Sequence, residues 1–173
     1  MKVHWSIWLI LAGAALLAPA VSATIIEERD GFIVSTVDAG DAQAVSPGAL
    51  SIPRDGVANP GAGTIALPVA PDRVSSSIRQ GQTLSYSTAV PVGKTRFTSD
   101  LSWGNVATAL TLTIDSPGGT FGPYSDATDG TMDGRILLRI TRAGGLPSGT
   151  WWSDIYGQTV SGSQAFSHTA TVS

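Results

Sequence analysis

Three aspartates close together in the sequence offer oxygen ligands for a metal ion. Asp126, Asp129 and Asp133 lie in the stretch DATDGTMDG, together with Gly130 and Gly134. Calcium takes about six to eight oxygen ligands on a flexible loop, and the EF-hand version needs alternating acids and a distal Glu. The EF-hand pattern is absent, and Asp-Gly pairs are also common in ordinary turns. Two interpretations stay open: a calcium site at these aspartates, or a long loop without a metal.

Aromatic residues offer a second kind of site. Exposed rings bind sugar faces or other proteins because they contribute a large apolar area at low entropic cost. Trp151 and Trp152 are adjacent, so on a strand only one of them faces inward. The surrounding alternation places Trp151 inward and Trp152 outward. The candidate ligand-binding residues are Trp103, Trp152, Tyr156, Phe121 and Tyr124. The alternative is that Trp152 is covered by the N-terminal residues or by the Phe121–Tyr124 loop.

Catalytic groups are scarce. Beyond the N-terminal segment the chain has a single histidine, His168, on a predicted strand face with Phe166 and Ala170. A nucleophilic Ser needs a base held by an orienting group, and a lone His in an alternating strand is more often a packed residue. Neither G-x-S-x-G nor H-E-x-x-H occurs. We therefore expect no catalytic residues and no enzyme, with a hydrolase of unrecognised site as the alternative.

The N-terminus has the three parts of a secretory signal peptide. A short basic start is followed by an apolar run from Trp5 to Leu17, and then by small residues at Val21 and Ala23. The apolar run is shorter than the roughly 20 residues of a membrane span. We expect cleavage after Ala23 and export to the cell envelope or medium, with an uncleaved anchor as the alternative.

Composition excludes several classes of function. Without Lys2, nine of the 10 basic residues remain against 13 acidic ones, a net charge of −4 and no basic cluster. Nucleic-acid binding therefore has no electrostatic basis. The chain has no cysteine, which excludes disulfides, thiolate zinc sites and a Cys nucleophile. An exported protein without disulfides is typical of a prokaryotic envelope.

Short runs of alternating apolar and polar residues, separated by Gly, Pro and Asp turns, predict half-buried antiparallel strands. The predicted inward positions include Leu84, Tyr86, Thr88, Val90, Phe97, Leu101, Leu110, Leu112, Ile114, Ile136, Leu138, Ile140, Trp151, Ile155, Phe166, Ala170 and Val172. We predict an all-β fold, an antiparallel β-sandwich of jelly-roll type. Its expected organisation is a signal peptide at 1–23, an N-terminal arm with short strands at 24–72, and the sandwich at 73–173.

Two segments resemble the bacterial and archaeal pre-peptidase C-terminal (PPC) domain. The family's opening matches Gly81-Gln82, Tyr86, Val90–Gly93 and the strand Phe97–Trp103, and its ending matches Gly149–Trp151, Ile155–Gly157 and Phe166–Val172. The resemblance covers about Ser75 to Ser173 and implies a β-sandwich appended to secreted proteins, some of which bind calcium or polymers such as collagen. The family's Asp-x-Asp-Leu step is replaced here by GNVATALTLTI, so the family's calcium site does not transfer directly.

These features together predict a secreted, non-catalytic binding module. Its expected partner is an envelope protein or a polysaccharide, with calcium as the only candidate cofactor. The alternative is a structural surface protein that assembles with itself as a homo-oligomer through its Gly/Pro-rich arm.

Overall fold

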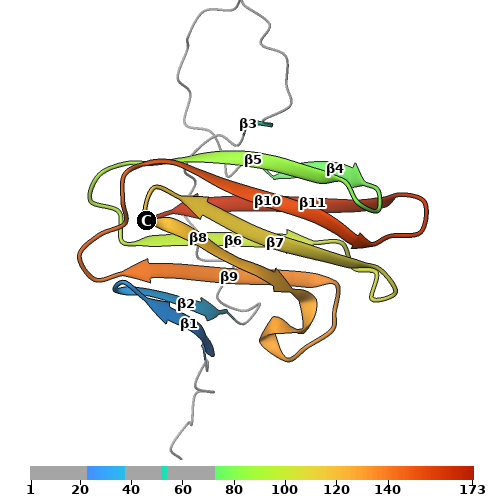
Figure 1. Cartoon of the computed structure of the whole chain (residues 1–173), viewed down its shortest axis with the longest axis horizontal. Coiled ribbons are helices and arrows are strands. Elements are labelled where there is room, and N and C mark those ends of the chain that lie inside the picture. Colours follow the sequence, from blue (N-terminus) through green and yellow to red (C-terminus); the bar gives the residue numbers. More distant parts are fainter. Residues whose placement is uncertain (1–22, 38–51, 54–72) are drawn as a thin grey trace, which may run out of the picture.

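The computed structural model describes residues 23–37, 52–53 and 73–173, which form two antiparallel β-sheets packed face to face (Figure 1). The six-stranded sheet has the order β1-β2-β9-β6-β11-β4, and the five-stranded sheet has the order β3-β5-β10-β7-β8. The strands are β1 (Ile25–Arg29), β2 (Phe32–Thr36), β3 (Ile52–Pro53), β4 (Val74–Ile78), β5 (Thr83–Val90), β6 (Arg96–Ser102), β7 (Ala109–Ser116), β8 (Gly119–Ser125), β9 (Arg135–Arg142), β10 (Gly149–Thr159) and β11 (Gln164–Val172). A short 3₁₀ helix, η2 (Asp126–Asp129), follows β8.

The strand order from β4 onward is that of a jelly roll. The chain changes sheet at every connection except the β7–β8 hairpin, so that β4-β11-β6-β9 faces β5-β10-β7-β8. In this eight-stranded, double-sheet arrangement β4 pairs with β11, β5 with β10, β6 with β9 and β7 with β8. The predicted all-β, antiparallel, jelly-roll-like sandwich is confirmed.

The predicted alternation gives the correct inward face on β5, β6, β7, β9, β10 and β11. Leu110, Leu112 and Ile114 are buried on β7, and the polar residues between them lie on the other face. Four aromatic rings join the two sheets. Trp151 of β10 stacks on Phe97 of β6 at 4.9 Å between centroids, and Phe121 of β8 meets Phe32 of β2 edge-on at 5.1 Å. Rings at these separations add to the burial of apolar area in holding the sheets together.

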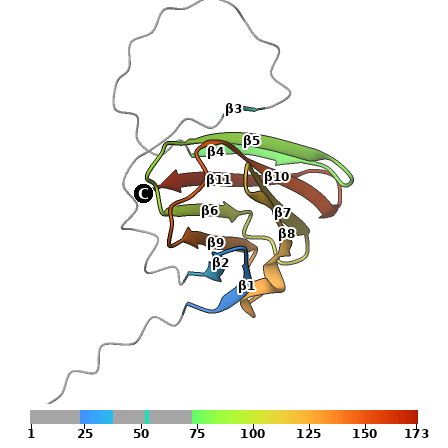
Figure 2. The ribbon, with the colours of Figure 1, turned by 60° about the vertical axis from the view of Figure 1, so that its left-hand side comes forward.

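An N-terminal hairpin extends the six-stranded sheet. Asp30 and Gly31 connect β1 to β2 with φ angles of 51° and 77°, as a two-residue turn of the mirror-image type requires. Strand β2 then pairs with β9 from Phe32 to Thr36, and Figure 2 shows the hairpin beneath β9. The expected arm at 24–72 therefore begins with two short strands, which pair with each other and with β9 of the six-stranded sheet.

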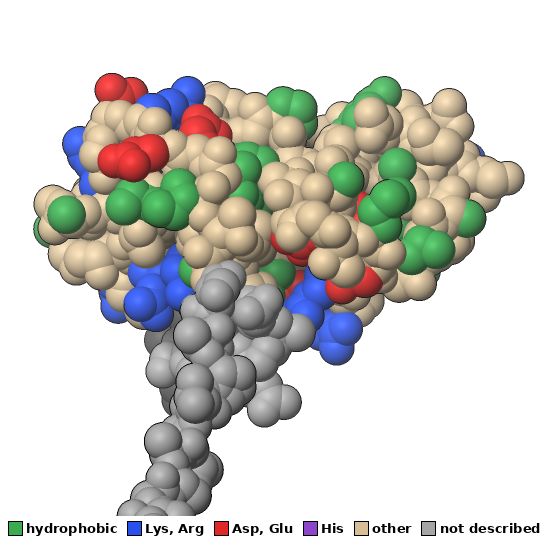
Figure 3. All heavy atoms as spheres, turned by 90° about the horizontal axis from the view of Figure 1, so that it is seen from below, with side chains coloured by type: hydrophobic (Ala, Val, Ile, Leu, Met, Phe, Trp, Pro, Cys, Tyr) green, Lys and Arg blue, Asp and Glu red, His purple; other side chains and the backbone are tan. Residues whose placement is uncertain are grey.

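Other parts of the expected organisation lie outside the described residues. The signal peptide falls on residues 1–22 and the adjoining Ala23, and most of the arm falls on 38–51 and 54–72. Within the described part of the chain, no helix is long and apolar enough to cross a membrane. On the face seen from below in Figure 3, acidic and basic side chains are interspersed and hydrophobic ones form small separate groups. This face has no continuous basic stripe.

Candidate functional site

His168 is a core residue. It is 0% exposed on β11 and forms a hydrogen bond of 3.0 Å between its Nε2 and the Oγ of Ser99, which is also 0% exposed. Its ring lies 5.6 Å from that of Tyr86. Burial lowers the pKa of His168 to about 4, because a charged imidazolium is disfavoured away from water. This Ser–His pair is closed to any substrate, and the prediction of a packed histidine is confirmed.

The three loop aspartates have different environments. Asp126 is buried, and its carboxylate accepts hydrogen bonds from the backbone N–H groups of Asp133, Gly134 and Arg135 at 3.0–3.2 Å. Asp129 accepts one from Thr131 N–H at 2.9 Å. Among the described residues, no three acidic or histidine side chains form a group able to hold a metal ion. Burial, followed by the charges of Asp126 and Asp129, raises the pKa of Asp133.

Trp103 is not the exposed ring that the sequence predicts. It is 7% exposed, at the end of β6, on the face that carries Phe97 and Leu101. Its Nε1 donates to the carbonyl oxygens of Asn105 at 3.0 Å and Thr108 at 3.2 Å. Trp103 therefore holds the β6–β7 connection against the core.

Phe121 and Tyr124 are also buried, which corrects their assignment to an exposed loop. They belong to β8, where a register shift against β7 turns both side chains inward. The Tyr124 hydroxyl donates to Glu27 Oε2 at 2.7 Å, and Arg29 lies 4.6 Å over the ring of Phe121. Burial and the bond to Glu27 raise the pKa of Tyr124. Both rings therefore fasten the β1–β2 hairpin to the edge of the other sheet.

The two remaining aromatic candidates lie on one surface. Trp152, Asp154 and Tyr156 alternate along β10, the central strand of the five-stranded sheet, and point away from the core. Tyr156 is 41% exposed. Trp152 is half-buried and interacts with another residue. We call this surface the outer face. Figure 1 shows β10 running along the middle of its sheet.

Hydroxyl side chains flank this row on both sides. Asp154 is paired with Ser85 of β5 and Thr113 of β7, and Tyr156 with Thr83 and Thr111. Oδ1 of Asp154 is buried and accepts no hydrogen bond from any described residue. Nearby, Thr120 donates to Asp115 at 2.5 Å. The outer face thus combines an exposed ring, a carboxylate and rows of hydroxyls on a sheet, which suits a flat ligand with many hydroxyl groups.

The class of protein is therefore a jelly-roll β-sandwich with a mixed aromatic and hydroxyl face and with its Ser99–His168 pair enclosed in the core. No family model matches the chain, and no curated protein matches it. Among solved structures it is similar to PliG of Aeromonas hydrophila, a periplasmic lysozyme inhibitor of g-type lysozyme. The identity is 16%, the coverage is 64% of this chain and 93% of that chain, and the TM-score is 0.39. A likeness at this level assigns neither a family nor a function.

Proposed function

We propose that this chain is an exported, non-catalytic module that binds an envelope polysaccharide through its outer face. The observation that carries the proposal is the row Trp152–Asp154–Tyr156 on the central strand, flanked by hydroxyl side chains. A sugar ring presents C–H groups to an aromatic face and hydroxyls to its rim, so rings beside Ser, Thr and Asp complement it.

A polysaccharide fits this surface better than a protein partner. The core of a protein interface is largely apolar and depleted of charge. On the outer face, the rings of β10 are separated by Asp154, and the neighbouring positions on β5 and β7 carry Ser and Thr. Export is supported by the signal-peptide pattern. The two-sheet fold is compatible with the resemblance to PPC domains, which remains part of the proposal.

Replacing Tyr156 with alanine is expected to weaken retention on insoluble cell-wall polysaccharide by about ten-fold or more, because a central ring is often worth over 1.4 kcal/mol in binding. Tyr156→Phe keeps the ring and should keep most of the binding. Val92→Ala is the control, since Val92 is 85% exposed on the β5–β6 turn, away from the outer face. A pull-down with insoluble cell-wall polysaccharide measures the binding. Unchanged melting temperatures show that each variant is folded. Equal binding by Tyr156→Ala and the native chain would contradict the proposal.

Calcium at the Asp126–Asp133 loop remains a prediction. Burial and then the charges of Asp126 and Asp129 raise the pKa of Asp133, and a bound cation would relieve the part that is due to repulsion between carboxylates. A ligand that binds only the folded chain raises its stability, so millimolar calcium should raise the melting temperature and chelator should reverse the rise. Magnesium is the control ion. A melting temperature that responds to neither calcium nor chelator would contradict a calcium site at this loop.

A further inference from the structure

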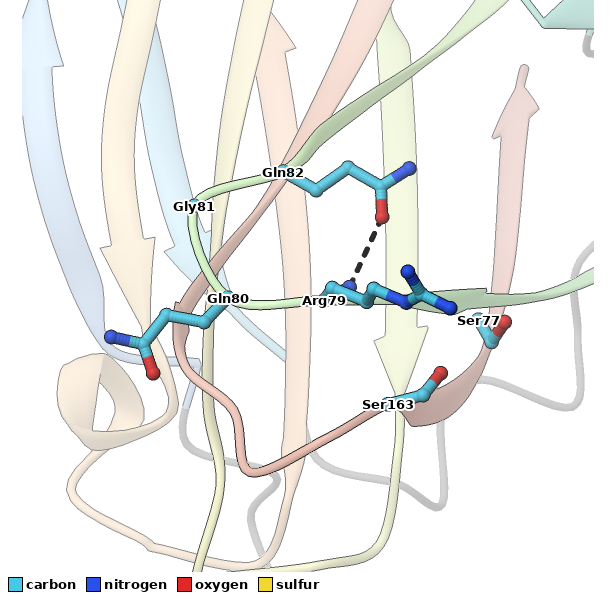
Figure 4. Close-up of a pocket in the computed structure, with 6 residues that line it drawn as sticks. All are labelled: Ser77, Arg79, Gln80, Gly81, Gln82 and Ser163. Atoms are coloured by element: carbon cyan, nitrogen blue, oxygen red, sulfur yellow. Dashed lines mark hydrogen bonds between the residues drawn. The ribbon is translucent and has the colours of Figure 1, made fainter.

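A hollow lies at one end of the sandwich, between the turn that joins β4 to β5 and the connection from β10 to β11. It has a volume of about 570 Å³ and is lined by Ser77, Arg79, Gln80, Gly81, Gln82 and Ser163 (Figure 4). Ligand sites commonly have volumes of about 300–1,000 Å³. The hollow is built from residues other than those of the outer face, so its role is separate from the function proposed above.

The turn that forms this hollow is held in one conformation. Gln82 Oε1 accepts from the backbone N–H of Arg79 at 3.1 Å, and Gln82 N–H donates to the Arg79 carbonyl at 3.1 Å. Gly81 N–H donates to Gly157 O at 2.8 Å, and Gly157 N–H donates to Gln82 O at 3.0 Å. A Cβ on Gly157 would overlap the Arg79 carbonyl. The turn therefore packs directly on the backbone of β10, and its side chains are presented from a fixed base.

The side chains of the lining are polar and include one positive charge, that of Arg79. In Figure 4 the side chains of Arg79, Gln82, Ser77 and Ser163 lie on the same side of the turn, whereas Gln80 points away. Because Oε1 of Gln82 is already bonded, its NH₂ group is the end left for a ligand. The guanidinium of Arg79 makes no ion pair or hydrogen bond with a described residue, and the lining contains no carboxylate. A guanidinium without an acidic partner among the described residues, beside neutral polar groups, favours an anionic ligand.

We propose that this hollow binds the carboxylate of a uronic acid unit in an acidic polysaccharide. The guanidinium forms a planar fork that matches a carboxylate with two parallel hydrogen bonds. Gln82 and the hydroxyls of Ser77 and Ser163 then face the ring hydroxyls of the same sugar. The volume holds a sugar unit, whereas an inorganic anion would leave most of it empty. An acidic peptide fits less well, because the lining has no aromatic or aliphatic side chain to hold a peptide residue.

Calorimetric titration of the full chain with trigalacturonate at low salt tests this proposal. We expect binding that weakens with added salt, falls at least ten-fold in Arg79→Ala, and is lost when the probe is methyl-esterified. Arg79→Lys keeps the charge without the fork, and its affinity should fall between those of the native chain and Arg79→Ala. Arg73→Ala is the matched control, because it removes the same charge from an exposed arginine at the opposite end of β4, away from the hollow.

The outcomes separate this site from the outer face. Trigalacturonate binding that survives in Tyr156→Ala but not in Arg79→Ala supports the hollow, whether or not Tyr156→Ala affects retention on cell-wall polysaccharide. Equal losses of trigalacturonate affinity in Arg79→Ala and Arg73→Ala would show that binding depends on the net charge of the chain rather than on the hollow, and would overturn the proposal. So would a failure of the native chain to bind trigalacturonate, or equally tight, Arg79-dependent binding of a tetraglutamate peptide.

Discussion

Replacing His168 with glutamine is expected to remove a large part of the acid sensitivity of the fold. Burial lowers the pKa of His168 to about 4 in the folded chain, against about 6.5 in an unfolded one. As the pH falls through 6.5, the unfolded state takes up a proton that the folded state refuses. The free energy of unfolding therefore decreases between pH 6.5 and about 4, by about 3 kcal/mol in total.

Urea unfolding at pH 7.5, 6, 5 and 4 measures this effect. The native chain and Ser99→Ala should lose stability in parallel, because Ser99→Ala keeps the imidazole and removes only its 3.0 Å partner. His168→Gln should be less stable than the native chain at pH 7.5, since the imidazole packs against Tyr86, yet lose about 3 kcal/mol less on acidification. Carboxylate titrations are common to all three chains and cancel in the comparison. If the free energy of unfolding fell equally with pH in His168→Gln and the native chain, the folded chain would protonate His168 as readily as the unfolded chain does.

Strand alternation was enough to identify the core but not every exposed ring. Trp103 continues the face of Phe97 and Leu101 by two-residue steps, and it is buried with them. The alternation therefore placed Trp103 correctly in the core, whereas the large aromatic ring alone suggested an exposed contact residue. Trp152 and Tyr156 fall on the opposite face from Trp151 and Ile155, as the same alternation predicted.

The segment from Gly119 to Ser125 could not be predicted from local pattern. Its Gly and Pro content is typical of a loop, yet it pairs with β7 as an edge strand. Phe121 and Tyr124 are three residues apart and would alternate to opposite faces of a regular strand. The register shift opposite Leu112 and Ile114 turns both inward. This shift is favoured by the hairpin partners Glu27 and Arg29, which lie almost 100 residues away in the chain.

The hollow at Arg79 could not be predicted from the local sequence either. A lone Arg in a Gln-Gly turn has no distinguishing local pattern, and Ser163 reaches the hollow only once β4 and β11 are paired. Gly157 gave the one available signal. A glycine inside a long strand often marks a close approach of another backbone, and here that backbone is the turn at Arg79.

Asp126→Ala is expected to cost about 2–4 kcal/mol of the free energy of unfolding, with or without calcium. The Asp126 carboxylate is the acceptor for three consecutive backbone N–H groups, and that of Gly134 is buried. Leaving a buried donor unpaired costs its full desolvation, and bonds to a charged acceptor are stronger than neutral ones. Gly134 in turn accepts from the N–H groups of Trp103 and Gly104, so the loss reaches the end of β6.

Asp126→Asn and Asp129→Ala make this prediction specific. The amide oxygen of Asn keeps an acceptor without the charge, so Asp126→Asn should lose less than Asp126→Ala. Asp129→Ala removes only the bond from Thr131 and should stay within about 1 kcal/mol. If the loop existed mainly to hold calcium, the two alanine variants would be equally stable in chelator and would differ from the native chain only when calcium is present. If the Asp126 carboxylate is instead the structural centre of the loop, the order of stability will be the same in both conditions.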